Sequence, residues 1–251
     1  MTDVKLTDDE WIKIREFLRH DPNAYSGTDE TVCRCFIEAV KWVSRSGAQW
    51  RLLPTEYGKW NSVYKRFVRW CQAGVWERML AAFAQDADLE NGMIDSTVVR
   101  AHPCAAGAQK KRGEQALGRS RGGFSCKVHV TVDGLGNPLR LRLTAGQRHD
   151  STQAQALLEG FDFERLIADR GYAAEEFIAY LLSRGIQAVI PPHQRAKVLR
   201  EYDKWLYRER HLVECFMNKI KHFRRIFSRF EKLDRSYLGF LDFVSVLIWL
   251  R

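Results

Sequence analysis

A change of hydrophobic period near Gly92 constrains the fold of this chain more than any other feature. Up to Glu90, apolar residues recur every three or four positions, as in amphipathic helices. From Met93 onward, short β-branched segments alternate with longer helical patterns. We therefore expect an all-α region at residues 1–90, followed by an α/β region at residues 91–251. A basic, Gly-rich loop is expected at about 103–123.

Four helices are predicted in the first region: one that begins at Thr7 and continues through Leu18, and others at about 28–45, 59–72 and 75–85. Thr7 followed by Glu10 matches a capping box, and Gly47 is expected to end the second helix. The second and third helices could form a unit that resembles a helix-turn-helix, or a plain helical bundle. In the first case, the candidates for DNA contact are basic residues of the third helix: Lys59, Lys65, Arg66 and Arg69.

The second region has the predicted order β-β-β-α-β-α-β-α. The strands are expected at about 93–100, 124–133, 138–144, 165–169 and 187–190, and the final helix at 235–250. A hairpin followed by crossover connections gives a mixed sheet with helices on both faces. This is the order of the ribonuclease H fold.

Three acidic residues in this region are candidates for a metal site. Asp95 lies inside an apolar strand, where a charge is costly unless it is paired or binds metal. Asp169 ends a later strand, and open α/β sheets place their sites beyond strand ends. Together with Glu214 on a long helix, they could hold two Mg²⁺ ions for phosphodiester chemistry. The alternatives are a strand-end cap for Asp95 and a turn residue for Asp169. Asp150 is expected to cap a helix instead, with Gln153 as its partner.

The helix with Glu214 has two different faces. Tyr207, Arg210, Glu214 and Lys221 fall within an arc of about 60° on a helical wheel. The opposite side is apolar and is expected to be buried: Leu212, Phe216, Ile220, Phe223, Phe227 and Phe230. A carboxylate among cations suits a site for metal and nucleic acid phosphate, although an ordinary amphipathic helix has the same pattern.

The charge of the chain is distributed unevenly. The net charge is +9, yet residues 1–90 carry 13 Lys and Arg against 14 Asp and Glu. One basic stretch begins at Lys110, Lys111 and Arg112, and another covers 192–232. This distribution predicts a polyanionic partner, with generic solubility as the alternative.

The remaining composition excludes several classes. Six cysteines occur without a CxxC pair or zinc-like spacing, so we expect reduced thiols. No apolar run is long enough to span a membrane, and the N-terminus has no signal-peptide pattern. The protein is therefore expected in the cytoplasm, with no membrane partner. His102 and His149 could touch the site or DNA, but structural roles are favoured.

These motifs resemble those of DDE transposases in the insertion-sequence-four and -five group. The spacing from Tyr207 through Arg210 and Glu214 to Lys221 matches the signature helix of that group. Asp95 in Ile-Asp-Ser-Thr and Asp169 in Ala-Asp-Arg-Gly-Tyr match its two aspartate motifs. Segments 6–11, 50–54, 122–125, 133–138, 146–151 and 247–251 match further landmarks. The resemblance covers nearly the whole chain and is closest to the IS-five family.

The resemblance implies an activity and a set of roles. Asp95, Asp169 and Glu214 would bind Mg²⁺, with Mn²⁺ as a possible substitute, while Arg210 and Lys221 would hold DNA phosphates. Tyr207 would support the cleaved end. The enzyme would bind terminal inverted repeats, cleave at the element ends and join the 3′-hydroxyl to target DNA, as a homodimer or larger assembly. The alternatives are a nuclease of the same fold without strand transfer, and a DNA-binding regulator with an inert core.

Overall fold

The computed structural model describes residues 5–24, 29–107, 113–120, 122–193 and 200–251. The first part of the chain is helical, with α1 (Asp8–His20), α2 (Glu30–Ser46), α3 (Trp60–Gln72) and α4 (Val75–Phe83). The predicted capping box is confirmed, since Thr7 and Glu10 exchange backbone-to-side-chain hydrogen bonds of 3.0 and 3.1 Å. Gly47 ends α2 with φ +67°, a left-handed conformation that favours glycine.

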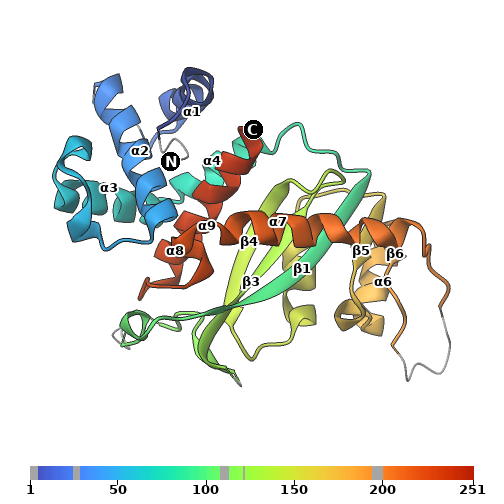
Figure 1. The fold of residues 1–251 in the computed structure, drawn as a ribbon. Coiled ribbons are helices and arrows are strands. Elements are labelled where there is room, and N and C mark those ends of the chain that lie inside the picture. Colours follow the sequence, from blue (N-terminus) through green and yellow to red (C-terminus); the bar gives the residue numbers. More distant parts are fainter. Residues whose placement is uncertain (1–4, 25–28, 108–112, 121, 194–199) are drawn as a thin grey trace.

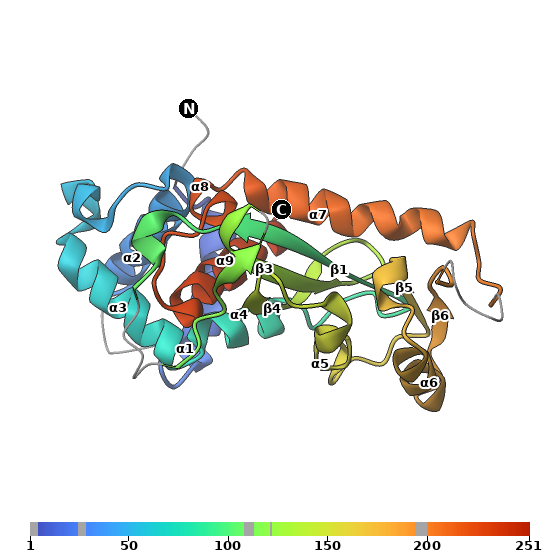
Figure 2. The same ribbon diagram turned by 90° about the horizontal axis from the view of Figure 1, so that it is seen from below.

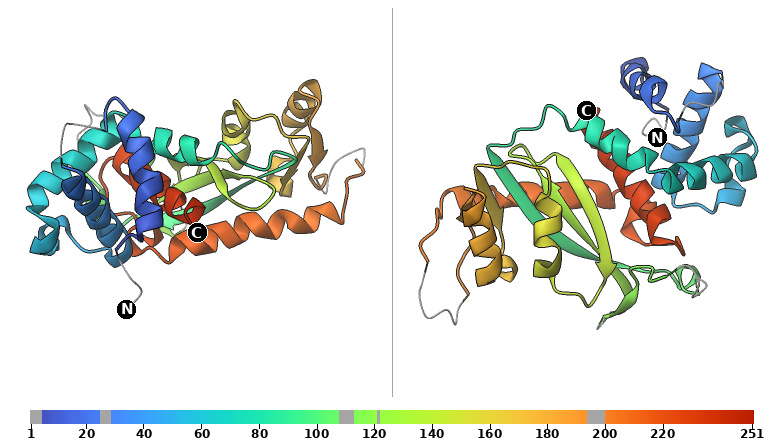
Figure 3. Two further views of the ribbon diagram at one scale, coloured as in Figure 1. Left: turned by 90° about the horizontal axis from the view of Figure 1, so that it is seen from above. Right: turned by 180° about the vertical axis from the view of Figure 1, so that it is seen from behind.

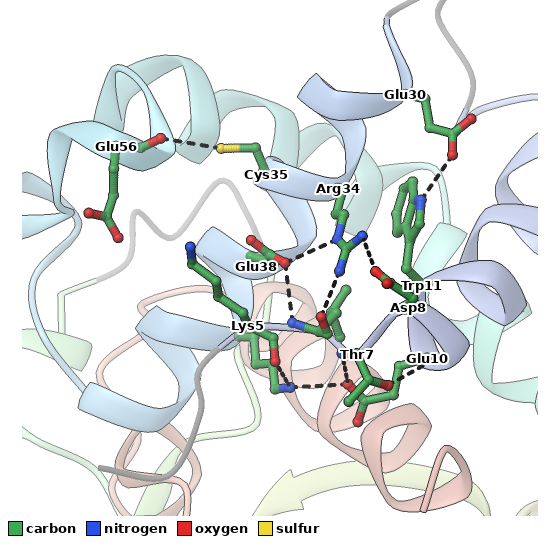
Figure 4. A network of polar contacts seen from close by, with 12 residues as sticks. Lys5, Thr7, Asp8, Glu10, Trp11, Glu30, Arg34, Cys35, Glu38 and Glu56 are labelled. Atoms are coloured by element: carbon green, nitrogen blue, oxygen red, sulfur yellow. Dashed lines mark hydrogen bonds and ion pairs between the residues drawn. The ribbon is translucent and has the colours of Figure 1, made fainter.

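Polar contacts fix α1 against α2 (Figure 4). The Arg34 guanidinium donates to an Asp8 carboxylate oxygen and to the Leu6 carbonyl, each over 2.7 Å. Glu38, which is buried, accepts hydrogen bonds from the Leu6 backbone N–H and from Arg34 Nε. Because both ends of each contact are paired, these charged groups can sit at the helix interface without a large desolvation cost.

The second part of the chain forms one mixed sheet (Figure 1). Its strands are β1 (Asn91–Arg100), β2 (Gly118–Ser120), β3 (Gly123–Val132), β4 (Pro138–Ala145), β5 (Arg165–Ala168) and β6 (Gln187–Val189). β3 is antiparallel to both β1 and β4, whereas β1, β5 and β6 are parallel. The order β4-β3-β1-β5-β6, with β2 extending the β4 side of β3, is that of the ribonuclease H fold. The predicted fold class is therefore confirmed.

Helices cover both faces of the sheet (Figure 2). α7 (His211–Lys221), α8 (Arg224–Phe227) and α9 (Asp234–Trp249) belong to one side, while α5 (Ala154–Leu158) and α6 (Glu175–Ser183) cover the other. Successive side chains of a strand point to opposite faces. Met93 accordingly packs in the core beneath α7, and its neighbour Ile94 packs with Leu157 of α5.

The helical part and the sheet share one apolar core. α9 lies between the N-terminal helices and the sheet, as two further views show (Figure 3). Phe240 of α9 is fully buried, with its ring centroid 4.3 Å from that of Phe67 in α3. α9 approaches closely at Gly239, where a Cβ atom would lie 2.6 Å from the Cys71 Sγ atom. The sheet begins with β1 at Asn91, and the apolar packing continues from the helical part into it.

Several local expectations were wrong. The sequence pattern missed β2, which is three residues long and lies in the Gly-rich segment. The helix expected over 150–158 is a 3₁₀ turn (Asp150–Gln153) followed by α5. The helix expected to carry Tyr207 through Phe230 begins as a 3₁₀ turn (Leu206–Arg210) and ends at Lys221. Phe227, expected on its buried face, is 65% exposed because the chain turns before α8.

Candidate active site

Asp95 and Asp169 are brought together by two neighbouring parallel strands. Ile94 of β1 pairs with Ala168 of β5, and each aspartate follows its paired residue directly. Alternation along the strands turns both away from the face that holds Ile94 and Ala168, and toward α7. Their placement beside each other is therefore a consequence of strand register.

Local hydrogen bonds hold both carboxylates. The Asp95 Oδ1 atom accepts the Ser96 backbone N–H over 2.7 Å. The Asp169 Oδ1 atom accepts the Gly171 backbone N–H over 2.8 Å and caps the 3₁₀ turn Arg170–Tyr172. A Cβ atom at Gly171 would lie 2.9 Å from that Oδ1 atom, so a larger residue there would displace the Asp169 carboxylate from this position. Asp169 thus acts as a turn residue through its Oδ1 atom, and its Oδ2 atom does not take part in that cap.

Glu214 joins these aspartates from the first turn of α7. Arg210 lies between the two sides: its Nη1 atom is 3.0 Å from Asp95 Oδ2, and its Nη2 atom donates to Glu214 Oε1. The side chain of Glu214 is 49% exposed, against 18% for Asp95 and 23% for Arg210. The arginine therefore bridges a largely buried carboxylate and a solvent-facing one.

The electrostatics reflect this crowding of acidic groups. Burial raises the pKa of the Asp95 carboxyl, and the charges of Asp169 and Glu214 act in the same direction. The Ser96 N–H and Arg210 oppose that rise. Burial disfavours the Arg210 charge, but the surrounding carboxylates outweigh it and raise the Arg210 pKa. Mutual repulsion between carboxylates favours any cation that comes to lie among them.

The remaining residues of the signature helix are placed differently. Tyr207 is half-buried; burial raises its pKa, Arg210 counteracts this, and Asp169 is close enough to reinforce it. Because residues 206–210 form a 3₁₀ turn, the expected α-helical wheel does not apply to Tyr207 and Arg210. Lys221 lies seven residues beyond Glu214, about 10 Å along the helix axis. It is therefore not next to the carboxylates.

No group of three His, Cys, Asp or Glu side chains in the described part of the chain is already arranged to hold a metal ion. Arg210 lies between two of the candidate ligands, as its contacts with Asp95 and Glu214 establish. The donor set nevertheless suits a hard divalent cation, since carboxylate oxygens are the ligands such ions prefer. A metal ion at this position would compete with Arg210 for the Asp95 Oδ2 and Glu214 Oε1 atoms.

The basic residues expected at α3 differ in accessibility. Lys59, Lys65 and Arg69 are exposed. Arg66 is partly buried, with its guanidinium over the rings of Phe36 and Trp70 and a contact of 3.1 Å to the Cys33 Sγ atom. Its position is that of a packing residue. The expected DNA contacts Lys110, Lys111 and Arg112 lie outside the described residues.

Asp150 is not the helix cap that the sequence pattern predicted. No side chain caps the 3₁₀ turn that it begins. Its Oδ1 atom instead accepts the Ser96 hydroxyl over 2.7 Å and pairs with the Lys127 Nζ atom at 2.9 Å. The available signal was the alternation in β3, which places Lys127 and His129 on one face. Their partner on another element could not be read from local spacing.

The two histidines differ as well. The His102 Nδ1 atom accepts the Cys104 backbone N–H, and its ring stacks on Phe230 with centroids 5.1 Å apart. This is a structural role, as expected. His149 is exposed, so its side chain is accessible to DNA.

A ribonuclease H-like sheet with three acidic side chains gathered on the face beneath α7 defines a class of enzymes that cut and join nucleic acid strands. The family model described as "Transposase DDE domain" matches residues 87–241. A second model, "Putative transposase of IS4/5 family (DUF4096)", matches residues 6–80. The chain belongs to the DDE transposase family of insertion sequences, and is a DNA transposase. Domains of this family depend on divalent metal ions.

Individual relatives support the assignment. A protein of Brucella ovis, "Putative transposase for insertion sequence element IS6501", is 39% identical over 130 residues, which are 51% of this chain and 100% of the relative. A protein of Burkholderia cepacia, "Putative transposase for insertion sequence element IS402", is 33% identical and covers 55% of this chain and 68% of the relative. These similarities, together with the two family models, account for both the helical part and the sheet.

A solved structure with distant similarity is a piggyBac transposase synaptic complex with hairpin DNA. It is 10% identical with a TM-score of 0.43, and the match covers 77% of this chain and half of that chain's length (50%). Similarity at this level carries no conclusion about function. Within the described residues, no helix combines the length and apolar character needed to cross a membrane.

Proposed function

We propose that this transposase binds the terminal inverted repeats of an insertion sequence, hydrolyses a DNA strand at each element end and joins the 3′-hydroxyl to target DNA. One observation carries the proposal: Asp95, Asp169 and Glu214, from three separate segments, lie near Arg210 on the face of the sheet beneath α7. Such an arrangement supports phosphodiester chemistry, because it pairs a carboxylate cluster with a group that binds phosphate.

Asp95, Asp169 and Glu214 would hold the metal, with Mg²⁺ as the natural ion and Mn²⁺ as a substitute. When bound, such ions activate a water or a 3′-hydroxyl and stabilise the leaving oxygen of the phosphodiester. The strand register of Asp95 and Asp169 fixes two ligands on a rigid element. Glu214, which is half exposed on α7, can adjust as the third.

Arg210 would move from the carboxylates to a phosphate of the transposon end. Its guanidinium already faces the site, and its planar donors suit a phosphate as well as a carboxylate. Tyr207, close to Asp169, would support the cleaved end. Lys221 would hold the DNA backbone about two turns further along α7.

Binding of the element end would extend to the helical part. Lys59, Lys65 and Arg69 are exposed on α3 and at its start, and would contact the DNA there. Lys110, Lys111 and Arg112 are proposed as further DNA contacts on the basis of their charge. Arg66 would support α3 through its packing against Phe36. Because two ends must be cut together, we expect at least a homodimer on DNA.

Labelled element ends, target DNA and Mg²⁺ provide the test. Wild-type protein should give joined products that contain both labelled end and target. Cleaved ends without joining would favour the nuclease, and binding without cleavage would favour the inert regulator. The Asp169→Asn variant should bind the ends and leave them uncut, since it loses a metal ligand but no basic residue.

A further inference from the structure

A polar cluster lies on the sheet face opposite the carboxylates, directly behind Asp95. This Asp150 cluster consists of Ser96, Lys127, His129 and Asp150. Ser96 follows Asp95 in β1 and therefore points to the other face. It pairs with His129 across the β1–β3 ladder, and Lys127 lies two residues further along β3 on the same face.

Hydrogen bonds and an ion pair connect the cluster through one oxygen. The Asp150 Oδ1 atom accepts the Ser96 hydroxyl over 2.7 Å and lies 2.9 Å from the Lys127 Nζ atom. Lys127 also donates to the Arg148 carbonyl over 2.7 Å, which fixes the loop before Asp150. The His129 Nδ1 atom is 3.8 Å from the same carboxylate, and its Nε2 atom contacts the Thr144 hydroxyl over 2.8 Å.

Burial strengthens these contacts and determines which basic group carries the charge that pairs with Asp150. His129 is fully buried, and the side chain of Lys127 is 12% exposed. Burial lowers the pKa of His129 to about 4, and Lys127 adds to that effect against the opposing pull of Asp150. His129 is therefore neutral near pH 7, and Lys127 is the ionic partner of Asp150. Charge-assisted hydrogen bonds in such surroundings are stronger than neutral ones.

The cluster connects to both aspartates of the candidate metal site. The Ser96 backbone N–H holds Asp95 Oδ1 over 2.7 Å, while its hydroxyl is held by Asp150. Tyr172 ends the 3₁₀ turn that Asp169 caps, and its buried hydroxyl has no hydrogen-bond partner within 3.5 Å among the described residues. Burial raises the Tyr172 pKa, the charges of Asp150, Asp95 and Asp169 reinforce this rise, and an interaction with the Ser96 side chain opposes it, so the hydroxyl lies close to these groups.

We propose that Asp150 is a positioning residue: through Ser96 it fixes the part of β1 that presents Asp95, and thereby sets the affinity of the carboxylate site for divalent metal. This inference rests on the proposed function, in which Asp95, Asp169 and Glu214 bind the metal. Asp150 itself lies behind the strand and does not contact Asp95. It acts in the way that outer groups orient metal ligands, whose loss costs about ten- to a hundredfold in metal affinity.

The test is a titration of the full chain with Mn²⁺ in the absence of DNA. The concentration of free Mn²⁺ is measured by electron paramagnetic resonance. Asp150→Asn and Ser96→Ala should each weaken binding about tenfold or more. The matched control is Asp162→Asn, which removes a surface carboxylate between α5 and β5 that pairs with Arg184 at 2.8 Å. It should leave the Mn²⁺ affinity unchanged.

A double-mutant cycle separates positioning from a loss of stability. If Asp150 acts through Ser96, the double variant should have about the same Mn²⁺ affinity as the single variant that binds Mn²⁺ more weakly. The reason is that both substitutions break the same hydrogen bond between Ser96 and Asp150. Additive effects, or wild-type affinity in a folded Asp150→Asn protein, would overturn the inference. Ser96→Ala keeps the test decisive if Asp150→Asn fails to fold, and wild-type affinity there would overturn it too.

The Asp169→Asn variant distinguishes this inference from the proposed function. If Asp169→Asn binds Mn²⁺ like wild type, the carboxylates are not the metal site, and both proposals fall. If Asp169→Asn loses Mn²⁺ binding while the variants of the Asp150 cluster retain it, only the positioning role is refuted.

Discussion

Replacing Arg210 by Gln should make DNA-free protein bind Mn²⁺ more tightly. Arg210 bridges Asp95 and Glu214, so a metal ion must compete with its guanidinium for those oxygens. The substitution removes the competitor and one positive charge from the site. Arg208→Gln is the matched control, because it makes the same change of charge two residues away on an exposed side chain.

The size of the effect follows from how exposed the ion pair is. Two unit charges about 4 Å apart interact by about 4 kcal/mol at an effective dielectric constant of about 20. Fully exposed pairs contribute at most about 1 kcal/mol. The side chains of Arg210 and Asp95 are 23% and 18% exposed, between these limits. A net competition of about 2 kcal/mol corresponds to Mn²⁺ binding that is about thirtyfold tighter in the variant.

Calorimetric titration with Mn²⁺ measures this affinity, and a pH of about 8 is chosen because the raised Asp95 pKa makes the ionised, metal-binding carboxylate more populated as the pH rises. Wild-type protein bound to element-end DNA should also gain Mn²⁺ affinity, because a phosphate draws Arg210 away. The Arg210→Gln variant should lose most of that gain, since binding coupling is reciprocal. An unchanged or weaker Mn²⁺ affinity in the DNA-free variant would refute the competition.

Three other outcomes are expected. Asp169→Asn should abolish cleavage of labelled ends with little change in their binding, and residual cleavage near the wild-type rate would contradict a ligand role. Lys65→Gln should lower the slope of log affinity against log salt by about 1, whereas Lys13→Gln on α1 should not, as nitrocellulose filter binding can measure. Phe240→Ala should destabilise the whole chain by about 3 to 5 kcal/mol in denaturant unfolding, and exposed Phe227→Ala by much less; two separate transitions would show that helical part and sheet unfold independently.

Much of the architecture was predictable because periodicity is a local signal. Alternation in β3 and the helical spacing of α2 and α3 are set by which face each element buries. The carboxylates Asp95 and Asp169 could be recognised because a charge in or just after an apolar strand is costly to bury unless it is paired or binds a ligand. The two aspartates then lie side by side because their strands are neighbours and pair in register.

The remaining features depend on contacts between distant segments. Asp150 followed by Gln153 matches a helix cap, and only the packing of that turn behind β1 gives Asp150 its partners Ser96 and Lys127. The end of α7 at Lys221 has no Gly or Pro to mark it, which is why Phe227 was expected to be buried. The bridge made by Arg210 likewise arises only when β1 and α7 meet.

Anomalous diffraction from crystals grown with Mn²⁺ and element-end DNA tests the central claim most directly. We expect manganese within bonding distance of Asp95, Asp169 and Glu214, with Arg210 moved from the carboxylates to a DNA phosphate. Manganese bound elsewhere, or an Arg210 that still bridges Asp95 and Glu214 in the DNA complex, would contradict the account.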